Sequence, residues 1–146
     1  MKPKVFADSS VLVAAILESH PWHARALPWL QRARGHEVDL WVAAHSLAET
    51  YAVLTAYPAK PRVVPLEALN AIEDGVLSTA SVVALTAADY TAALRWVAER
   101  GLSGGVVYDA IIVQAARKSG ADRILTFDVD DFRRVWPEGK DRISAP

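Results

Sequence analysis

Residues 4–10, KVFADSS, contain the junction that decides the fold. The apolar stretch Lys4–Ala7 is typical of a short strand, and it runs through Asp8 into a helical stretch, Ser9–Glu18. The same order returns near the C-terminus, where a strand at Arg123–Phe127 is followed by Asp128 and a short helix. Because ligands bind outside the carboxyl ends of parallel strands, we predict both aspartates at one edge of a sheet.

Strands and helices alternate over the rest of the chain. We predict further strands at Val38–Val42, Ser81–Leu85 and Arg142–Ser144, and helices at Pro21–Arg34, Ser46–Tyr57, Leu66–Val76, Ala87–Glu99, Asp109–Lys118 and Val129–Val135. This alternation predicts an α/β fold of three layers, with a mainly parallel central sheet between two layers of helices. At 146 residues the chain is expected to form a single domain over residues 1–146.

Composition excludes several classes of protein. There is no cysteine, which rules out disulfide bridges, thiolate zinc sites and a cysteine nucleophile. The formal charge of −1 gives no general attraction to nucleic acid, so any contact with a polyanion must rest on local patches and a bound metal. The apolar run VLVAAIL is too short to cross a bilayer, and no signal-peptide cleavage pattern follows it. We therefore expect a soluble, cytoplasmic protein with no membrane partner.

Two further acids occupy comparable positions, Glu49 in HSLAET and Asp109 in VVYDAI. Each acid has an alternative role as a helix cap: Glu49 follows Ser46 at capping-box spacing, and Asp8, Asp109 and Asp128 all precede helical stretches. If the four carboxylates gather at one edge, they repel and desolvate one another unless a cation lies among them. The pattern therefore predicts a hard divalent metal, Mg²⁺ or Mn²⁺, held by oxygen ligands.

The other candidate residues carry weaker signals. His20 and His23 have a spacing that can bind zinc, but no further ligand accompanies them, so solvent-facing or capping roles are favoured. The five tryptophans fall mostly at helical apolar positions, which favours burial in a core or an interface. The sequence contains no GxSxG nucleophile elbow, no GxxxxGK[ST] phosphate loop and no GxGxxG dinucleotide motif.

Four motifs in order resemble one known family. An N-terminal strand ending in DSS, a helix carrying SLAE, a helix with the pattern YDAxIxxxA, and a strand ending in LTFD followed by DF look like the PIN domain. The resemblance covers almost the whole chain, and the length and the PWH-containing second helix look like the VapC-type toxins of bacterial toxin–antitoxin pairs. No single motif is specific for this family, but the ordered set of four motifs at these spacings is.

This resemblance implies a metal-dependent endoribonuclease that uses Mg²⁺ or Mn²⁺ to hydrolyse RNA phosphodiester bonds. It places the catalytic, metal-binding acids at Asp8, Glu49, Asp109 and Asp128, and it brings in Ser9, Thr126 and Asp131 as supporting residues. Asp130 and Asp131 lie close enough to Asp128 to share or replace it as the fourth acid. Basic residues at the rim that are candidates for holding flanking phosphates are Lys60, Arg62, Arg117 and Arg133.

The resemblance also implies partners. These are an RNA substrate, a VapB-type antitoxin whose C-terminal segment lies in a groove of the toxin, and a second copy of the chain in a homodimer. The apolar faces of Ser9–Glu18, Pro21–Arg34 and Leu66–Val76 are candidate walls of that groove. Two rival interpretations are a metal-dependent phosphatase and a non-catalytic PIN-like binding module. The first strand ends in DSS rather than DxD, which disfavours a phosphatase, and the presence of all four acids disfavours a module without catalysis.

Overall fold

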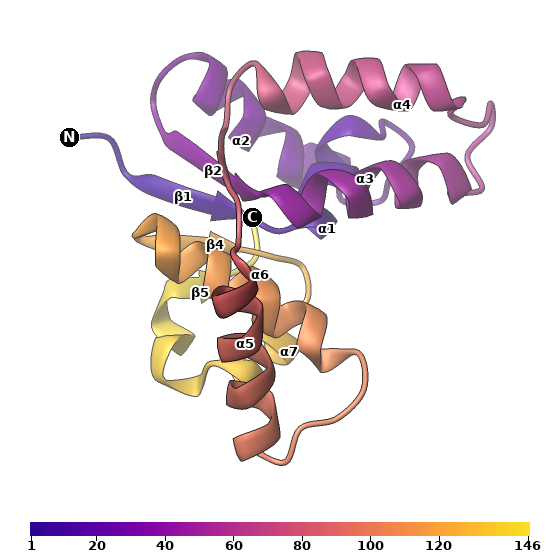
Figure 1. The fold of residues 1–146 in the computed structure, drawn as a ribbon. Coiled ribbons are helices and arrows are strands. Elements are labelled where there is room, and N and C mark those ends of the chain that lie inside the picture. The colour runs from indigo at the N-terminus through magenta and orange to yellow at the C-terminus, as the bar shows by residue number, and fades with distance from the viewer.

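A single sheet of five parallel strands forms the centre of the molecule (Figure 1). The computed structural model describes residues 1–146. The strands are β1 Lys4–Ala7, β2 Asp39–Ala43, β3 Ser81–Val83, β4 Arg123–Leu125 and β5 Ile143–Ser144, and their order across the sheet is β3-β2-β1-β4-β5. The prediction of a three-layer α/β fold with a mainly parallel sheet is confirmed. No helix is long and apolar enough to reach across a membrane.

Helices cover both faces of the sheet. Their bounds are α1 Ser9–Ile16, α2 His23–Arg34, α3 Ala44–Ala56, α4 Pro65–Ile72, α5 Ala87–Glu99, α6 Val106–Ser119 and α7 Val129–Val135, with a π-helical turn at Glu73–Leu77 and a 3₁₀ turn at Pro137–Arg142. Figure 1 shows α1 to α4 gathered on one side of the sheet and α5 to α7 on the other. Parallel strands need such helical crossovers, and these bury both faces of the sheet.

Strand β1 shows how the two cores divide. Phe6 is fully buried and packs with residues of α5, α6 and α7, whereas its neighbours Val5 and Ala7 pack with residues of α1 and α2. Successive side chains on a strand point to opposite faces, so one short apolar strand serves both cores. A third apolar cluster joins α1, α3 and α4 through residues such as Leu54 and Ile72.

The register of the sheet decides which residues meet at its carboxyl edge. Ala7 pairs with Leu125 of β4, and the backbone N–H of Asp8 donates to the Leu125 carbonyl at 2.9 Å. Strand β1 is central, with β4 on one side and β2 on the other. The residues that follow β1 and β4 therefore emerge side by side, and Asp8 lies beside Thr126.

Two helices begin two or three residues earlier than the sequence predicts, and α4 begins one residue earlier, at Pro65. Helix α3 starts at Ala44 rather than Ser46, and α6 starts at Val106 rather than Asp109. Neither helix has a side-chain cap, because Ala43 and Gly105 precede them, so the polar residue used as a start signal lies inside the helix. The capping alternatives for Glu49 and Asp109 are therefore wrong.

Candidate active site

Asp8 is the buried centre of the acidic edge. Its side chain is only 5% exposed, and it accepts hydrogen bonds from the Ser9 backbone N–H at 2.7 Å, from Ser10 Oγ at 2.9 Å and from Thr126 Oγ1 at 2.9 Å. Burial raises the pKa of this carboxyl group, Asp128 raises it further, and the two hydroxyl groups oppose the shift by stabilising the charged form. Asp8 does cap α1, yet most of its bonds serve to hold a carboxylate in a fixed position.

Two hydroxyl groups connect Asp8 to the loop after β4. Ser10 Oγ, which donates to Asp8, accepts from the Phe127 backbone N–H at 3.1 Å. Thr126 Oγ1 likewise accepts from the Asp128 backbone N–H at 3.0 Å. We expected Ser9 to supply a supporting hydroxyl, but its Oγ lies 3.4 Å from Asp8 Oδ1, farther than the hydroxyl of Ser10. Ser10 of the same DSS motif makes the closer contact, although only Ser9 was named as a supporting residue.

The pKa of Asp109 gives the clearest evidence that the acids lie close together. It is half-buried in the first turn of α6, and its pKa is raised from 3.8 to about 7. The largest cause is burial, and the charges that raise it further belong to Asp8, Asp131, Asp128 and Glu49, in that order. All the predicted acids therefore lie within electrostatic reach of Asp109, and no basic group offsets them there.

Glu49 faces the cluster from α3 and has a side-chain partner on the same helix. His45 Nδ1 lies 2.9 Å from Glu49 Oε1, one helical turn away, and the His45 ring stacks on Tyr108 with 6.2 Å between centroids. Tyr108 directly precedes Asp109, so this contact joins α3 to α6 beside the acids. The spacing of His45 and Glu49 is the signal that could have found the pair.

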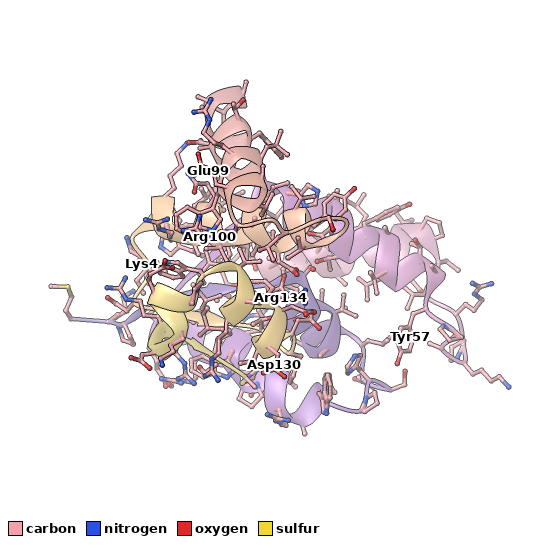
Figure 2. The ribbon with its side chains drawn as sticks, turned by 90° about the horizontal axis from the view of Figure 1, so that it is seen from below. Lys4, Tyr57, Glu99, Arg100, Asp130 and Arg134 are labelled. Carbon is pink, nitrogen blue, oxygen red and sulfur yellow. The ribbon has the colours of Figure 1, made fainter.

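Asp128 lies at the start of α7, where it makes no side-chain capping bond. The capping alternative for this residue is therefore wrong. The residue is exposed as a whole, but partial shielding of its carboxyl group raises its pKa, and Asp131 raises it further. Asp131 itself is exposed, and it pairs with Arg134 at 3.4 Å. Figure 2 shows Asp130 and Arg134 on this helix, away from Lys4, which marks the beginning of β1.

The donor set matches the chemistry of a hard cation. Carboxylate oxygens are the ligands that Mg²⁺ and Mn²⁺ prefer, and the raised pKa values show that the cluster lacks positive charge. No group of three or more acidic or histidine side chains is arranged closely enough to hold a metal as it stands. The carboxylates are thus electrostatic neighbours, and small side-chain movements would be needed to bring their oxygens around one ion.

Two of the basic residues considered for the rim are engaged elsewhere. Arg133 donates to the carbonyl groups of Lys140 and Ile143, and Arg117 lies over the rings of Trp96 and Trp136. These contacts hold Arg133 against the C-terminal segment and Arg117 on the outer side of α6. Neither arginine is therefore free to bind a flanking phosphate at the rim.

The family model of the PIN domain matches residues 5–136 of this chain. The chain belongs to the PIN domain family. Ribonuclease VapC40 of Mycobacterium tuberculosis is 33% identical over 134 residues, which cover 90% of this chain and 93% of that protein. Membership accounts for the order of the four motifs along the chain.

Solved structures share the fold. The crystal structure of Mycobacterium tuberculosis VapC20, described as a sarcin–ricin loop cleaving toxin, superposes with a TM-score of 0.67 at 20% identity, covering 87% of this chain and 92% of that one. VapBC2 from Rickettsia felis, solved with a DNA fragment from its promoter, gives a TM-score of 0.64 at 16% identity, with 98% of each chain covered.

Proposed function

We propose that this PIN domain protein is a metal-dependent endoribonuclease that acts as the toxin of a VapBC-type toxin–antitoxin system. The observation that carries the proposal is the meeting of four carboxylates at the carboxyl edge of the sheet, where burial and then the neighbouring acids raise the pKa of Asp109 to about 7. The ribonuclease named among its relatives supports the reaction class. The expected reaction is hydrolysis of an RNA phosphodiester bond with Mg²⁺ or Mn²⁺ as cofactor.

In this proposal Asp8, Glu49, Asp109 and Asp128 hold the metal, and Thr126, Ser9, Ser10 and Asp131 support them. A bound divalent cation would lower the pKa of a water molecule and stabilise negative charge on the phosphate oxygens. Asp8 Oδ2 accepts two hydroxyl hydrogen bonds and Oδ1 accepts the Ser9 backbone N–H, so both oxygens of this ligand are held in place. Thr126 and Ser10 hold Asp8 in position and favour its charged form, so this one ligand is oriented before a metal binds.

We further propose a VapB-type antitoxin as the inhibitor. An apolar cavity of about 370 Å³ lies between α1, α2 and the segment from α4 to the π-helical turn, lined by residues that include Ile16, Leu27, Leu30 and Ala71. These are the elements predicted as groove walls, and such a cavity suits an amphipathic segment. The toxin–antitoxin assembly among the structural neighbours supports this partner. A homodimer and a cytoplasmic location complete the proposal.

The rival functions gain no support from the site. A phosphatase usually has a DxD motif on the first strand or a lysine near the phosphoryl group; here the strand ends in DSS, and no lysine is among the groups that perturb the pKa of Asp8, Asp109 or Asp128. A binding module without catalysis has no need of a buried, hydroxyl-bonded Asp8 beside three further acids.

Cleavage of total RNA by the purified, antitoxin-free protein tests the proposal, with Mg²⁺ or Mn²⁺ and with EDTA. We expect discrete fragments that require the metal and disappear with Asp8→Asn. Asp122→Asn is the matched control, because it removes one exposed carboxylate just before β4, at the opposite edge of the sheet. Equal cleavage by both variants, or no cleavage by a folded wild-type protein that binds Mn²⁺, would refute a nuclease centred on Asp8.

A further inference from the structure

A row of four aromatic rings borders a cavity beside the acidic edge. Trp22 stacks on Phe127 with 4.4 Å between centroids and 22° between planes. His20 lies 5.9 Å from Trp22 on one side and 5.9 Å from Tyr57 on the other. With Val13 and Val53 these rings line a cavity of about 290 Å³. Figure 2 shows Tyr57 on the side of the molecule away from Lys4, consistent with the carboxyl edge of the sheet.

This cavity is continuous with the acidic site. Ser9, Ser10 and Asp128 form part of its wall, and each of them belongs to the Asp8 network or to the acid cluster. Phe127 is held directly by that network, because its backbone N–H donates to Ser10 Oγ, which donates to Asp8. The position of the aromatic row is therefore fixed relative to Asp8.

The rings are available to a ligand and carry no strong charge. Trp22 is 43% exposed although one of its faces covers Phe127, contrary to the burial expected for the tryptophans. His20 Nδ1 accepts from the Trp22 backbone N–H at 3.1 Å, so in the neutral ring Nε2 carries the proton. Burial, followed by His23, lowers the pKa of His20 and favours that neutral form. The cavity thus offers flat aromatic surfaces and neutral hydrogen-bond donors such as His20 Nε2, and the Arg25 guanidinium lies 5.4 Å from the centroid of the Phe127 ring at its border.

We propose that the cavity bordered by His20, Trp22, Tyr57 and Phe127 is a subsite for one unstacked nucleobase of a single-stranded RNA, next to the phosphate that is cleaved. This inference rests on the proposed ribonuclease function and adds to it a feature of the substrate. Aromatic side chains stack on bases of any sequence, and unpaired bases are the usual targets of protein–RNA stacking. The shared wall places such a base within one nucleotide of the acids, which repel phosphate in the absence of metal. The substrate is then a loop or another unpaired segment.

Equilibrium binding of fluorescein-labelled oligoadenylate hexamers tests the subsite, all in the Asp8→Asn background so that no cleavage occurs. The comparison probe is a hexamer with the same sugar–phosphate backbone and no bases. We expect Trp22→Ala to weaken oligoadenylate binding by about 5- to 100-fold, as for loss of one stacked base, and to change binding of the abasic hexamer by less than about twofold. Trp22→Phe keeps a ring and should retain most of the affinity.

Tyr51→Ala is the control, since Tyr51 is a comparably exposed aromatic residue on α3, at 40%, that does not line the cavity. Thermal melting verifies that each variant is folded. Equal affinities of wild-type and Trp22→Ala proteins for oligoadenylate would overturn the subsite, as would an equal loss for both hexamers. If Trp22→Ala loses its complex with a protein partner but keeps its affinity for RNA, the cavity belongs to that protein partner instead. The RNA cleavage assay decides the proposed function separately, because this binding measurement requires no catalysis.

Discussion

Thr126 Oγ1 donates to Asp8 Oδ2 at 2.9 Å, although 118 positions separate the two residues along the chain. The bond exists because β1 and β4 are neighbours in the sheet and both end at this edge. Thr126 is fully buried and also accepts from the Asp128 backbone N–H, so one hydroxyl group links two of the proposed metal ligands. A change at Thr126 should therefore affect both the stability of the fold and the geometry of the site.

Replacing Thr126 by Val keeps the shape of the side chain and removes its hydroxyl group. We expect the free energy of unfolding to fall by about 1–3 kcal/mol, because a buried carboxylate and a backbone N–H each lose a partner. RNA cleavage should fall with it, and Thr126→Ser should restore most of both. Urea denaturation and cleavage assays measure the two effects, and an unchanged free energy of unfolding in Thr126→Val would contradict the role given to this hydroxyl.

Asp109 should make the metal-free protein less stable as the pH rises. Its pKa is about 7 in the folded protein against 3.8 as the ordinary value, so between these values the folded state holds a proton that the unfolded chain has lost. Stability from this group is present below about pH 4 and is lost as the pH rises through 7. In EDTA, Asp109→Asn should therefore raise the free energy of unfolding at pH 8 by on the order of 1–2 kcal/mol, after allowance for solvent screening.

Melting temperatures at pH 5 and pH 8, with and without Mg²⁺, check this expectation. The metal should raise the melting temperature of the wild-type protein more at pH 8, where the cluster is charged, than at pH 5. Asp130→Asn serves as the control, since Asp130 is an exposed acid of the same region that does not contribute to the Asp109 shift. A stabilisation at pH 8 that is equal for Asp130→Asn and Asp109→Asn would show that general charge reduction is responsible.

His45 should position Glu49. Removing the ring in His45→Ala frees the Glu49 carboxylate from its 2.9 Å contact, so we expect Mn²⁺ binding to weaken by about tenfold, as for other partners of metal ligands. Isothermal titration calorimetry measures the affinity. Tyr108→Phe retains the stacked ring and should bind Mn²⁺ like the wild-type protein. Wild-type affinity in His45→Ala would mean that Glu49 needs no orientation or is not a ligand.

The apolar cavity between α1, α2 and α4 should govern inhibition without affecting catalysis. Ala71→Arg places a long charged side chain in this cavity, and we expect it to weaken the antitoxin complex by tenfold or more, on the order expected for a central interface position. Cleavage of RNA should stay at the wild-type level. Ala52→Arg, an exposed position on α3 outside the cavity, is the control. Co-purification with the co-expressed antitoxin and cleavage assays decide the outcome, and an intact complex would move the antitoxin to another surface.

The sequence predicted elements best where the signals are local. Helix α5 has the predicted bounds, Ala87–Glu99, because Thr86 and Asp89 form a capping box at its start. The starts of α3 and α6 were misplaced because Ala43 and Gly105 give no polar signal. Strand β4 ends at Leu125 rather than Phe127, since Thr126 and Phe127 turn to bond the Asp8 network.

The candidate site was predictable only in part, because only some of its signals are local in the sequence. Acids that follow strands share an edge once the sheet is parallel, so Asp8 and Asp128 could be placed from the alternation of elements. The roles of the four acids as ligands stay a prediction. The contact of Trp22 with Phe127 depends on how α2 packs beside the loop after β4, and no spacing in the sequence encodes that distance.

The position of β4 beside β1 has a consequence for synthesis of the protein on the ribosome. Asp8 is made 118 positions before its partner Thr126, and β4, Arg123–Leu125, is likewise made long after β1. A nascent chain that lacks these residues leaves the β4 side of β1 unpaired and has no Thr126 hydroxyl group to hold Asp8. The proposed site around Asp8 can therefore be completed only after β4 and Thr126 have been translated.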